Sequence, residues 1–229
     1  MFVWIGKMSY DQALWYEIFQ NEEYGLIKPF LSQTDVLIDG GAYKWFFALR
    51  ALKNWFNGRL ILIEPVKEFL SQAIELLKKE ASLLALEALN CALWVDSKKF
   101  YQDLDRWGHS SFDFGSFQIK FLQKKTKQLL RPKICDLNSV FEKLNLGNQK
   151  VGIKLDIEWA EFEVLQNFTC WQNVDWLVVE YHLLNPELEQ KFENLKNLFV
   201  QNFKQTKIKP SRYTDKIGLL VGINQNMVE

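Results

Sequence analysis

The sequence predicts an α/β domain in which a mostly parallel sheet carries helices on both faces. Short apolar runs rich in β-branched residues alternate with longer segments that have helical spacing. The first of these runs, residues 36–38, leads into Asp39-Gly40-Gly41 and then into a helical segment. A strand, an acidic tip, a glycine turn and a helix are typical of the first unit of a nucleotide-binding α/β domain. The last two expected strands have no helix between them, which indicates an antiparallel pair at the end of the chain.

The composition indicates one globular domain with room for a terminal extension, because the chain has 229 residues. Its formal net charge at pH 7 is zero, so we expect neither nucleic acid nor an acidic membrane as a partner. The three cysteines, Cys91, Cys135 and Cys170, lack the spacing of metal ligands, and we expect structural thiols in a reducing compartment. Residues 1–7 are apolar but soon interrupted by charge, which predicts neither a signal peptide nor a membrane span. We therefore expect a cytoplasmic protein.

The expected organisation is an N-terminal helical extension over residues 1–33 and one domain over residues 34–229. In the extension, residues 9–20 have a helical apolar face with Ser9 or Asp11 as N-cap, and residues 22–31 form a short helix interrupted at Pro29. In the domain, strands are expected at 35–39, 60–63, within 83–93, 151–155, 176–179, 203–207 and 218–223. Helices are expected at 45–56, 66–80, from 136 or 138 to 144, 160–168 and 186–201.

Regular alternation weakens after Trp94, and we interpret residues 95–135 as an insertion over the carboxyl edge of the sheet. It contains hairpin-like pieces at 98–103 and 117–121 and a turn at 108–111.

The glycine pair after the first strand favours a nucleoside without phosphates. A dinucleotide site uses G-x-G-x-x-G, whereas Gly40 and Gly41 are adjacent and Tyr43, Lys44 and Trp45 follow. This pattern disfavours a nicotinamide oxidoreductase. S-adenosylmethionine needs no phosphate cradle, and Asp39 can place a negative charge near its ammonium group. Taken alone, a glycine pair after a strand is better explained as an ordinary tight turn.

Glu64 strengthens this hypothesis, because it ends the second expected strand, at the distance from the glycines where an acid accepts both ribose hydroxyls. On its own, an acid followed by Pro65 is also explained as a simple cap.

Further polar residues gather at the tips of the fourth and fifth expected strands. Asp156 ends the fourth strand, and Glu158 and Glu161 follow it; the macrodipole of the next helix is another reason for acids there. Glu180 and His182 end the fifth strand and face the same side, because strand side chains alternate. The sequence pattern leaves open whether His182 has a functional or a structural role.

These motifs resemble the FkbM-type S-adenosylmethionine-dependent methyltransferases. The matching pieces run in family order from about residue 35 to 182: V-L-I-D-G-G-A at 36–42, I-E-P at 63–65, N-C-A-L at 90–93, S-S at 110–111, K-L-D-I-E-W-A-E-F-E-V-L at 154–165 and V-E-Y-H at 179–182. The resemblance implies a Rossmann-like class I methyltransferase fold with seven strands. It assigns cofactor binding to Asp39, Gly40, Gly41, Ala42, Glu64, Asn90 and Asp156, and the active cleft to Asp156, Glu158 and His182.

Two departures from the family pattern introduce bulk. The first block usually continues A-N-x-G, but here it reads Ala42-Tyr43-Lys44-Trp45, and Trp159 replaces the glycine of D-x-E-G-x-E. Either the cofactor loop is reshaped, or the aromatics form an apolar wall for an unusual substrate, or activity has been lost.

The resemblance favours oxygen as the methyl acceptor. The abundance of aromatic residues favours an apolar small molecule, natural product or peptide as the substrate. A hydroxyl acceptor needs a general base, for which His182 is the first candidate and Asp156 the second. A carboxylate acceptor needs none, because it is already ionised at neutral pH. No metal is expected, although a divalent ion held by Asp156, Glu158, Glu180 and His182 is an alternative. A non-catalytic binding module with the same fold is another.

Overall fold

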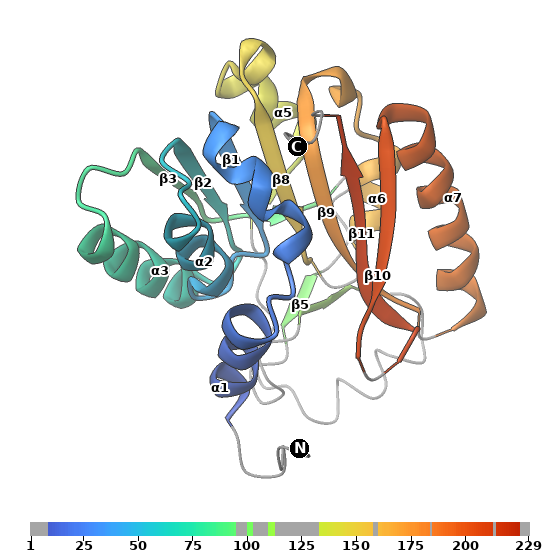
Figure 1. Cartoon of the computed structure of the whole chain (residues 1–229), viewed down its shortest axis with the longest axis horizontal. Coiled ribbons are helices and arrows are strands. Elements are labelled where there is room, and N and C mark those ends of the chain that lie inside the picture. The colour runs from blue at the N-terminus through green and yellow to red at the C-terminus, as the bar shows by residue number, and fades with distance from the viewer. Residues whose placement is uncertain are drawn as a thin grey trace.

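The computed structural model describes residues 9–94, 100–102, 110–112, 133–157, 160–183, 185–212 and 214–224. Its centre is a seven-stranded sheet in the order β10-β11-β9-β8-β1-β2-β3 (Figure 1). The strands are β1 Val36–Gly40, β2 Arg59–Ile63, β3 Leu86–Leu89, β8 Val151–Leu155, β9 Val174–His182, β10 Gln205–Pro210 and β11 Ile217–Ile223. Strand β11 is antiparallel to β9 and β10, and the other neighbouring strands are parallel. The prediction of a mostly parallel, Rossmann-like sheet with a closing antiparallel pair is confirmed.

Helices cover both faces of this sheet (Figure 1). Residues of α2 (Phe46–Lys53) and α3 (Lys67–Glu80) pack on one face, and residues of α5 (Leu137–Lys143), α6 (Glu161–Gln166) and α7 (Pro186–Asn202) pack on the other. Two short 3-10 helices, η4 (Leu146–Asn148) and η5 (Trp171–Asn173), connect elements on the second face. Because side chains alternate along β1, Val36 and Ile38 pack on the face covered by α5, α6 and α7, whereas Leu37 packs on the face covered by α2 and α3. Asp39 therefore faces the side of α2 and the N-terminal segment.

The N-terminal segment is helical, as expected, but differs in type. Helix α1 (Tyr10–Trp15) begins with a capping box between Ser9 and Gln12 and continues as a π-helix, η2 (Tyr16–Gln20). The short helix that we expected to be interrupted at Pro29 is instead a continuous 3-10 helix, η3 (Gly25–Gln33). The bonds of a 3-10 helix run to the third residue, so the clash of proline with the fourth carbonyl of an α-helix does not decide the outcome.

Most of the expected insertion, including the hairpin piece at 117–121, lies outside the described residues. Within it, β5 (Phe100–Gln102) pairs antiparallel with β6 (Ser110–Phe112). Ser110 and Ser111, which we expected in a turn, are therefore strand residues. No helix in the described part of the chain is both long enough and apolar enough to cross a membrane.

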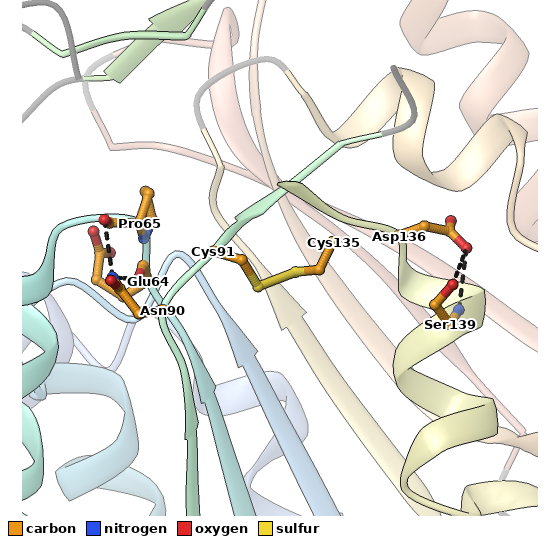
Figure 2. Close-up of a disulfide and its surroundings, with 7 residues drawn as sticks. All are labelled: Glu64, Pro65, Asn90, Cys91, Cys135, Asp136 and Ser139. Carbon is orange, nitrogen blue, oxygen red and sulfur yellow. Dashed lines mark hydrogen bonds between the residues drawn. A yellow bond between two sulfur atoms is a disulfide. The ribbon is translucent and has the colours of Figure 1, made fainter. Parts of the chain in front are cut away.

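Cys91 and Cys135 form a disulfide, so the expectation of free thiols was wrong for this pair (Figure 2). Strand β4 (Ala92–Leu93) pairs in parallel with β7 (Ile134–Cys135), and this pairing brings the two Cα atoms to 5.9 Å. The partners are 44 residues apart, and nothing in their spacing revealed the contact. Cys170 is free. Because disulfides persist mainly in oxidising surroundings, the cysteines no longer support a reducing compartment.

Candidate functional site

Asp39 and Lys154 form a buried ion pair at the centre of the sheet. They are register partners on β1 and β8, and Lys154 Nζ lies 3.2 Å from Asp39 Oδ1. Lys154 also donates to the carbonyl of Gly41 at 2.8 Å. Burial alone lowers the pKa of Lys154, but the carboxylates of Asp39 and Asp156 outweigh it, so the pKa is raised and the side chain stays charged. Burial raises the pKa of Asp39, and Lys154 opposes that effect.

The carboxylate of Asp39 is incompletely satisfied. Its side chain is fully buried, and its nearest partner is Lys154, whose Nζ lies 3.2 Å from Oδ1 and whose charge and hydrogen bond oppose the effect of burial on the pKa of Asp39. Among the described residues Oδ2 has no hydrogen-bond partner. This oxygen can therefore accept a further cationic or hydrogen-bonding group.

The glycine turn after β1 packs tightly against the tip of β8. A Cβ on Gly41, whose φ is +71°, would overlap the carbonyl oxygen of Asp156, and one on Gly40 would come within 2.9 Å of side chains of Leu155 and Leu93. The N–H groups of Gly41 and Ala42 both donate to the carbonyl of Ile63. Close packing thus explains the glycines, and cofactor contacts by Gly40, Gly41 and Ala42 remain predictions.

Glu64 lies beside Asp39 at the end of the neighbouring strand, as the sequence predicted. It is 6% exposed, and its two oxygens accept from the backbone N–H groups of Tyr43 and Val66 at 2.9 and 2.8 Å. Burial raises its pKa to about 7, although these two hydrogen bonds lower it. Each carboxylate oxygen has a second lone pair, so Glu64 can still accept from a ligand hydroxyl.

Asn90 fixes the turn that carries Glu64. Its side-chain amide donates to the carbonyls of Glu64 and Pro65 at 2.9 and 3.0 Å, and Figure 2 shows these three residues beside Cys91. A cavity of about 750 Å³ is lined by Pro65, Asn90 and the disulfide on one side and by residues of α5 on the other. There is therefore room for a ligand directly beside this turn.

Tyr43 and Lys44, which follow the glycine turn, hold the N-terminal helix. Tyr43 donates its hydroxyl to Asp11 at 3.0 Å, and its ring packs edge-on against Phe69. Lys44 pairs with the same carboxylate at 2.7 Å, and Trp45 stacks on Phe46. These contacts support a reshaped loop rather than an apolar wall. Glu158 and Trp159 lie outside the described residues.

Asp156 and Glu161 have different roles at the tip of β8. Asp156 Oδ2 lies 3.8 Å from Lys154 Nζ, and its side chain is 30% exposed, so it reaches the carboxyl edge. Glu161, which is almost fully buried, accepts from the N–H of Ile157 at 2.6 Å and secures the turn before α6.

Glu180 and His182 project together from β9, as alternation predicted. His182 Nε2 lies 3.6 Å from Glu180 Oε1, and the hydroxyl of Tyr24 donates to Glu180 Oε2 at 3.3 Å. Nearby, burial, Glu17 and Asp156 raise the pKa of Glu23 to about 7. The described residues contain no group of three or more histidine, cysteine, aspartate or glutamate side chains placed to hold a metal ion.

Sequence reasoning missed Lys154 and the residues from the N-terminal segment. A lysine inside an otherwise apolar strand was a usable signal, because a buried charge requires a partner. Tyr24 and Glu23 carried no such signal, since only the packing of η3 brings them to the sheet.

The sheet order and the parallel central strands define a Rossmann-like α/β fold. No protein-family model and no curated protein matches the chain. Among solved structures it is similar to the methyltransferase FkbM from Methylobacillus flagellatus KT, with 12% identity over 82% of this chain and 43% of that chain and a TM-score of 0.49. A structure of WbdD has 10% identity over 96% of this chain and 42% of that chain, with a TM-score of 0.51.

A third similar structure is the precorrin-6y C5,15-methyltransferase from Geobacter metallireducens GS-15, with 13% identity over 97% of this chain and 93% of that chain and a TM-score of 0.45. The chain spans less than half the length of the FkbM and WbdD chains. At such identities the likeness shows the fold.

Proposed function

We propose that this chain is an S-adenosylmethionine-dependent methyltransferase of the FkbM type that acts on an oxygen atom of a small molecule, natural product or peptide. The main support is the placement of Asp39 and Glu64 at adjacent strand ends, with the free Oδ2 of Asp39 next to the glycine turn. A cavity of about 750 Å³ lies beside the same turn and is lined by Pro65 and Asn90, although not by Asp39 or Glu64.

The residues fit this cofactor by charge and hydrogen-bonding capacity. Asp39 offers negative charge to an ammonium group, and Glu64 offers lone pairs to ribose hydroxyls. Asn90 and Gly41 keep the two surrounding turns in place, and Asp156 lies at the edge where the acceptor enters. The cofactor supplies an electrophilic methyl group on a sulfonium sulfur.

The chain itself aligns the acceptor and manages its proton. For a hydroxyl acceptor, His182 takes the proton, with Asp156 as the second candidate. For a carboxylate acceptor, alignment alone is sufficient, because the acceptor is already ionised.

Calorimetry with S-adenosylmethionine tests cofactor binding directly. We expect the wild-type chain to bind, and Asp39→Asn and Glu64→Gln to weaken binding at least about tenfold each, as the loss of one charged hydrogen bond predicts. Glu75→Gln, an exposed acid on α3, is the matched control and should bind normally. Absence of wild-type binding would refute the proposal.

Incubation with candidate alcohols and peptide acids, monitored for the mass gain of one methyl group, tests the chemistry. If the acceptor is a hydroxyl, His182→Gln abolishes turnover and the wild-type rate follows one ionisation near neutrality. A flat pH profile with a mild loss indicates a carboxylate acceptor. Binding without any methyl transfer favours the non-catalytic module, and loss of activity with a chelator favours the metal-assisted alternative.

A further inference from the structure

Three side chains from two distant parts of the chain form a continuous contact path. Tyr24, on the N-terminal segment, donates its hydroxyl to Glu180 Oε2 at 3.3 Å. The other oxygen of the same carboxylate lies 3.6 Å from His182 Nε2. Glu180 and His182 share one face of β9 because they are two residues apart on a strand. One carboxylate therefore lies between a phenol and an imidazole.

The first member of this path is held firmly. Tyr24 is 7% exposed, and its ring packs edge-on against Phe47 at 4.8 Å. Lys209 Nζ donates to the carbonyls of Glu22 and Glu23 at 3.0 and 2.6 Å, which ties the preceding residues to β10. Burial and the charge of Glu180 raise the pKa of Tyr24 well above its ordinary value, so the hydroxyl keeps its proton and can donate.

The two nitrogens of His182 have different surroundings. Nε2 faces the carboxylate of Glu180, whereas Nδ1 is buried and has no hydrogen-bond partner within the described part of the chain. A neutral imidazole carries one proton, and the nitrogen that faces an anion is the favoured place for it. The lone pair then resides on Nδ1.

We propose that Tyr24 and Glu180 are positioning residues that keep the proton of neutral His182 on Nε2 and leave Nδ1 as the basic nitrogen. This inference rests on the proposed function, in which His182 is the general base. Once an acceptor reaches this buried nitrogen, Nδ1 would take the hydroxyl proton while the oxygen gains the methyl group, and the sulfonium sulfur would keep the electron pair of the broken carbon–sulfur bond. Glu180 stabilises the resulting imidazolium, and Tyr24 holds Glu180 in place.

Other charged groups act on the same cluster. Glu23 belongs to the N-terminal segment, Lys154 and Asp156 to β8 and its tip, and Asp39 to β1; each of these groups interacts electrostatically with Tyr24, Glu180 or Lys154. A substitution that removes only a hydroxyl, or only the charge of Glu180, leaves those groups in place. It therefore isolates the contact path.

Nitrogen NMR of the imidazole tests this inference on the whole chain, without cofactor or acceptor. The sequence has two histidines, so His109→Gln leaves His182 as the single imidazole signal. We expect the Nε2–H tautomer in the neutral state. Tyr24→Phe keeps the ring that packs on Phe47 and should reduce the fraction of this tautomer.

Glu180→Gln should reduce the fraction of the Nε2–H tautomer further, because it removes the negative charge that lies 3.6 Å from Nε2. Tyr181→Phe is the control, because that residue belongs to the core on the opposite face and its hydroxyl donates to the carbonyl of Asp215.

A wild-type Nδ1–H tautomer would overturn the inference. So would an unchanged tautomer fraction in Glu180→Gln, provided that circular dichroism shows this variant folded. If Tyr24→Phe fails to fold, Glu180→Gln decides. Because these measurements need no ligand, their failure is distinct from failure of the proposed function, which calorimetry with S-adenosylmethionine decides.

Discussion

Replacing Lys154 with methionine should destabilise the protein by about 3–5 kcal/mol at neutral pH. The change keeps most of the side-chain volume but removes the charge that lies 3.2 Å from Asp39. Both side chains are almost completely buried, and removing one partner of a buried pair leaves an uncompensated charge. The two hydrogen bonds from Lys154 to the carbonyls of Gly40 and Gly41 are lost as well.

The magnitude follows from the way in which Asp39 can respond. Without Lys154 its pKa rises further, and the carboxyl folds in its neutral form. Keeping the carboxyl neutral then lowers the free energy of unfolding by about 1.36 kcal/mol for each pH unit above its ordinary pKa of 3.8. The loss is about 4 kcal/mol at pH 7 and about 2 kcal/mol at pH 5. Because the pKa of Asp39 is higher in the folded state than in the unfolded state, the stability of this variant is highest at low pH and falls as pH rises.

Urea unfolding of wild type and Lys154→Met at pH 7 and pH 5 measures this difference. Lys28→Met, which breaks an exposed pair with Glu22, is the control and should cost less than about 1 kcal/mol at both pH values. Adding Asp39→Asn to Lys154→Met should restore part of the loss at pH 7. A cost below about 1 kcal/mol, or an equal cost at both pH values, would refute the reasoning.

Three further predictions concern stability. Reducing the disulfide, or replacing both Cys91 and Cys135 with serine, should lower the free energy of unfolding by about 4 kcal/mol, because the disulfide closes a loop of 44 residues. Chemical unfolding measures this loss, and Cys170→Ser is the control that should change little; equal effects would contradict this account. Burial raises the pKa of Glu64 from 4.5 to about 7 in the folded state, so its contribution to stability should fall by about 3 kcal/mol as pH rises from 4.5 to 7. Glu64→Gln should flatten the plot of stability against pH over this range, and an unchanged slope would exclude Glu64 as the cause. Gly41→Ala should lower the melting temperature and the stability by about 1–3 kcal/mol, because it strains the backbone and overlaps Asp156. Gly147→Ala, where a Cβ meets nothing within 4 Å, should be nearly neutral, and similar losses for both variants would argue against the tight turn.

The sequence was sufficient for most of the sheet because apolar runs alternate with segments of helical spacing, although the third strand could be placed only within residues 83–93. It also identified the polar strand tips, since Asp39 and Glu64 each follow an apolar run directly and His182 comes three residues after Val179. These positions depend on local pattern and on the rule that the ends of parallel strands meet at one edge. The roles assigned to these residues remain predictions.

The contacts that the sequence did not predict are those made between distant segments. The disulfide requires the pairing of β4 with β7, which neither spacing nor hydropathy encodes. The partnership of Lys154 with Asp39 requires the register of β1 against β8. The 3-10 winding around Pro29 coincides with burial of Ile27, Phe30 and Leu31, which depends on the surrounding core rather than on local propensity.

The N-terminal segment contacts the loop after the glycine pair, and these contacts account for the large side chains in that loop. Asp11 on α1 accepts from Tyr43 and pairs with Lys44, and Glu22 pairs with Arg50 on α2 at 2.7 Å. The bulk that departs from the family pattern therefore fastens α1 to the loop that follows β1. The same segment places Tyr24 against Glu180, so it contacts the sheet at the end of β9 as well as the loop after β1.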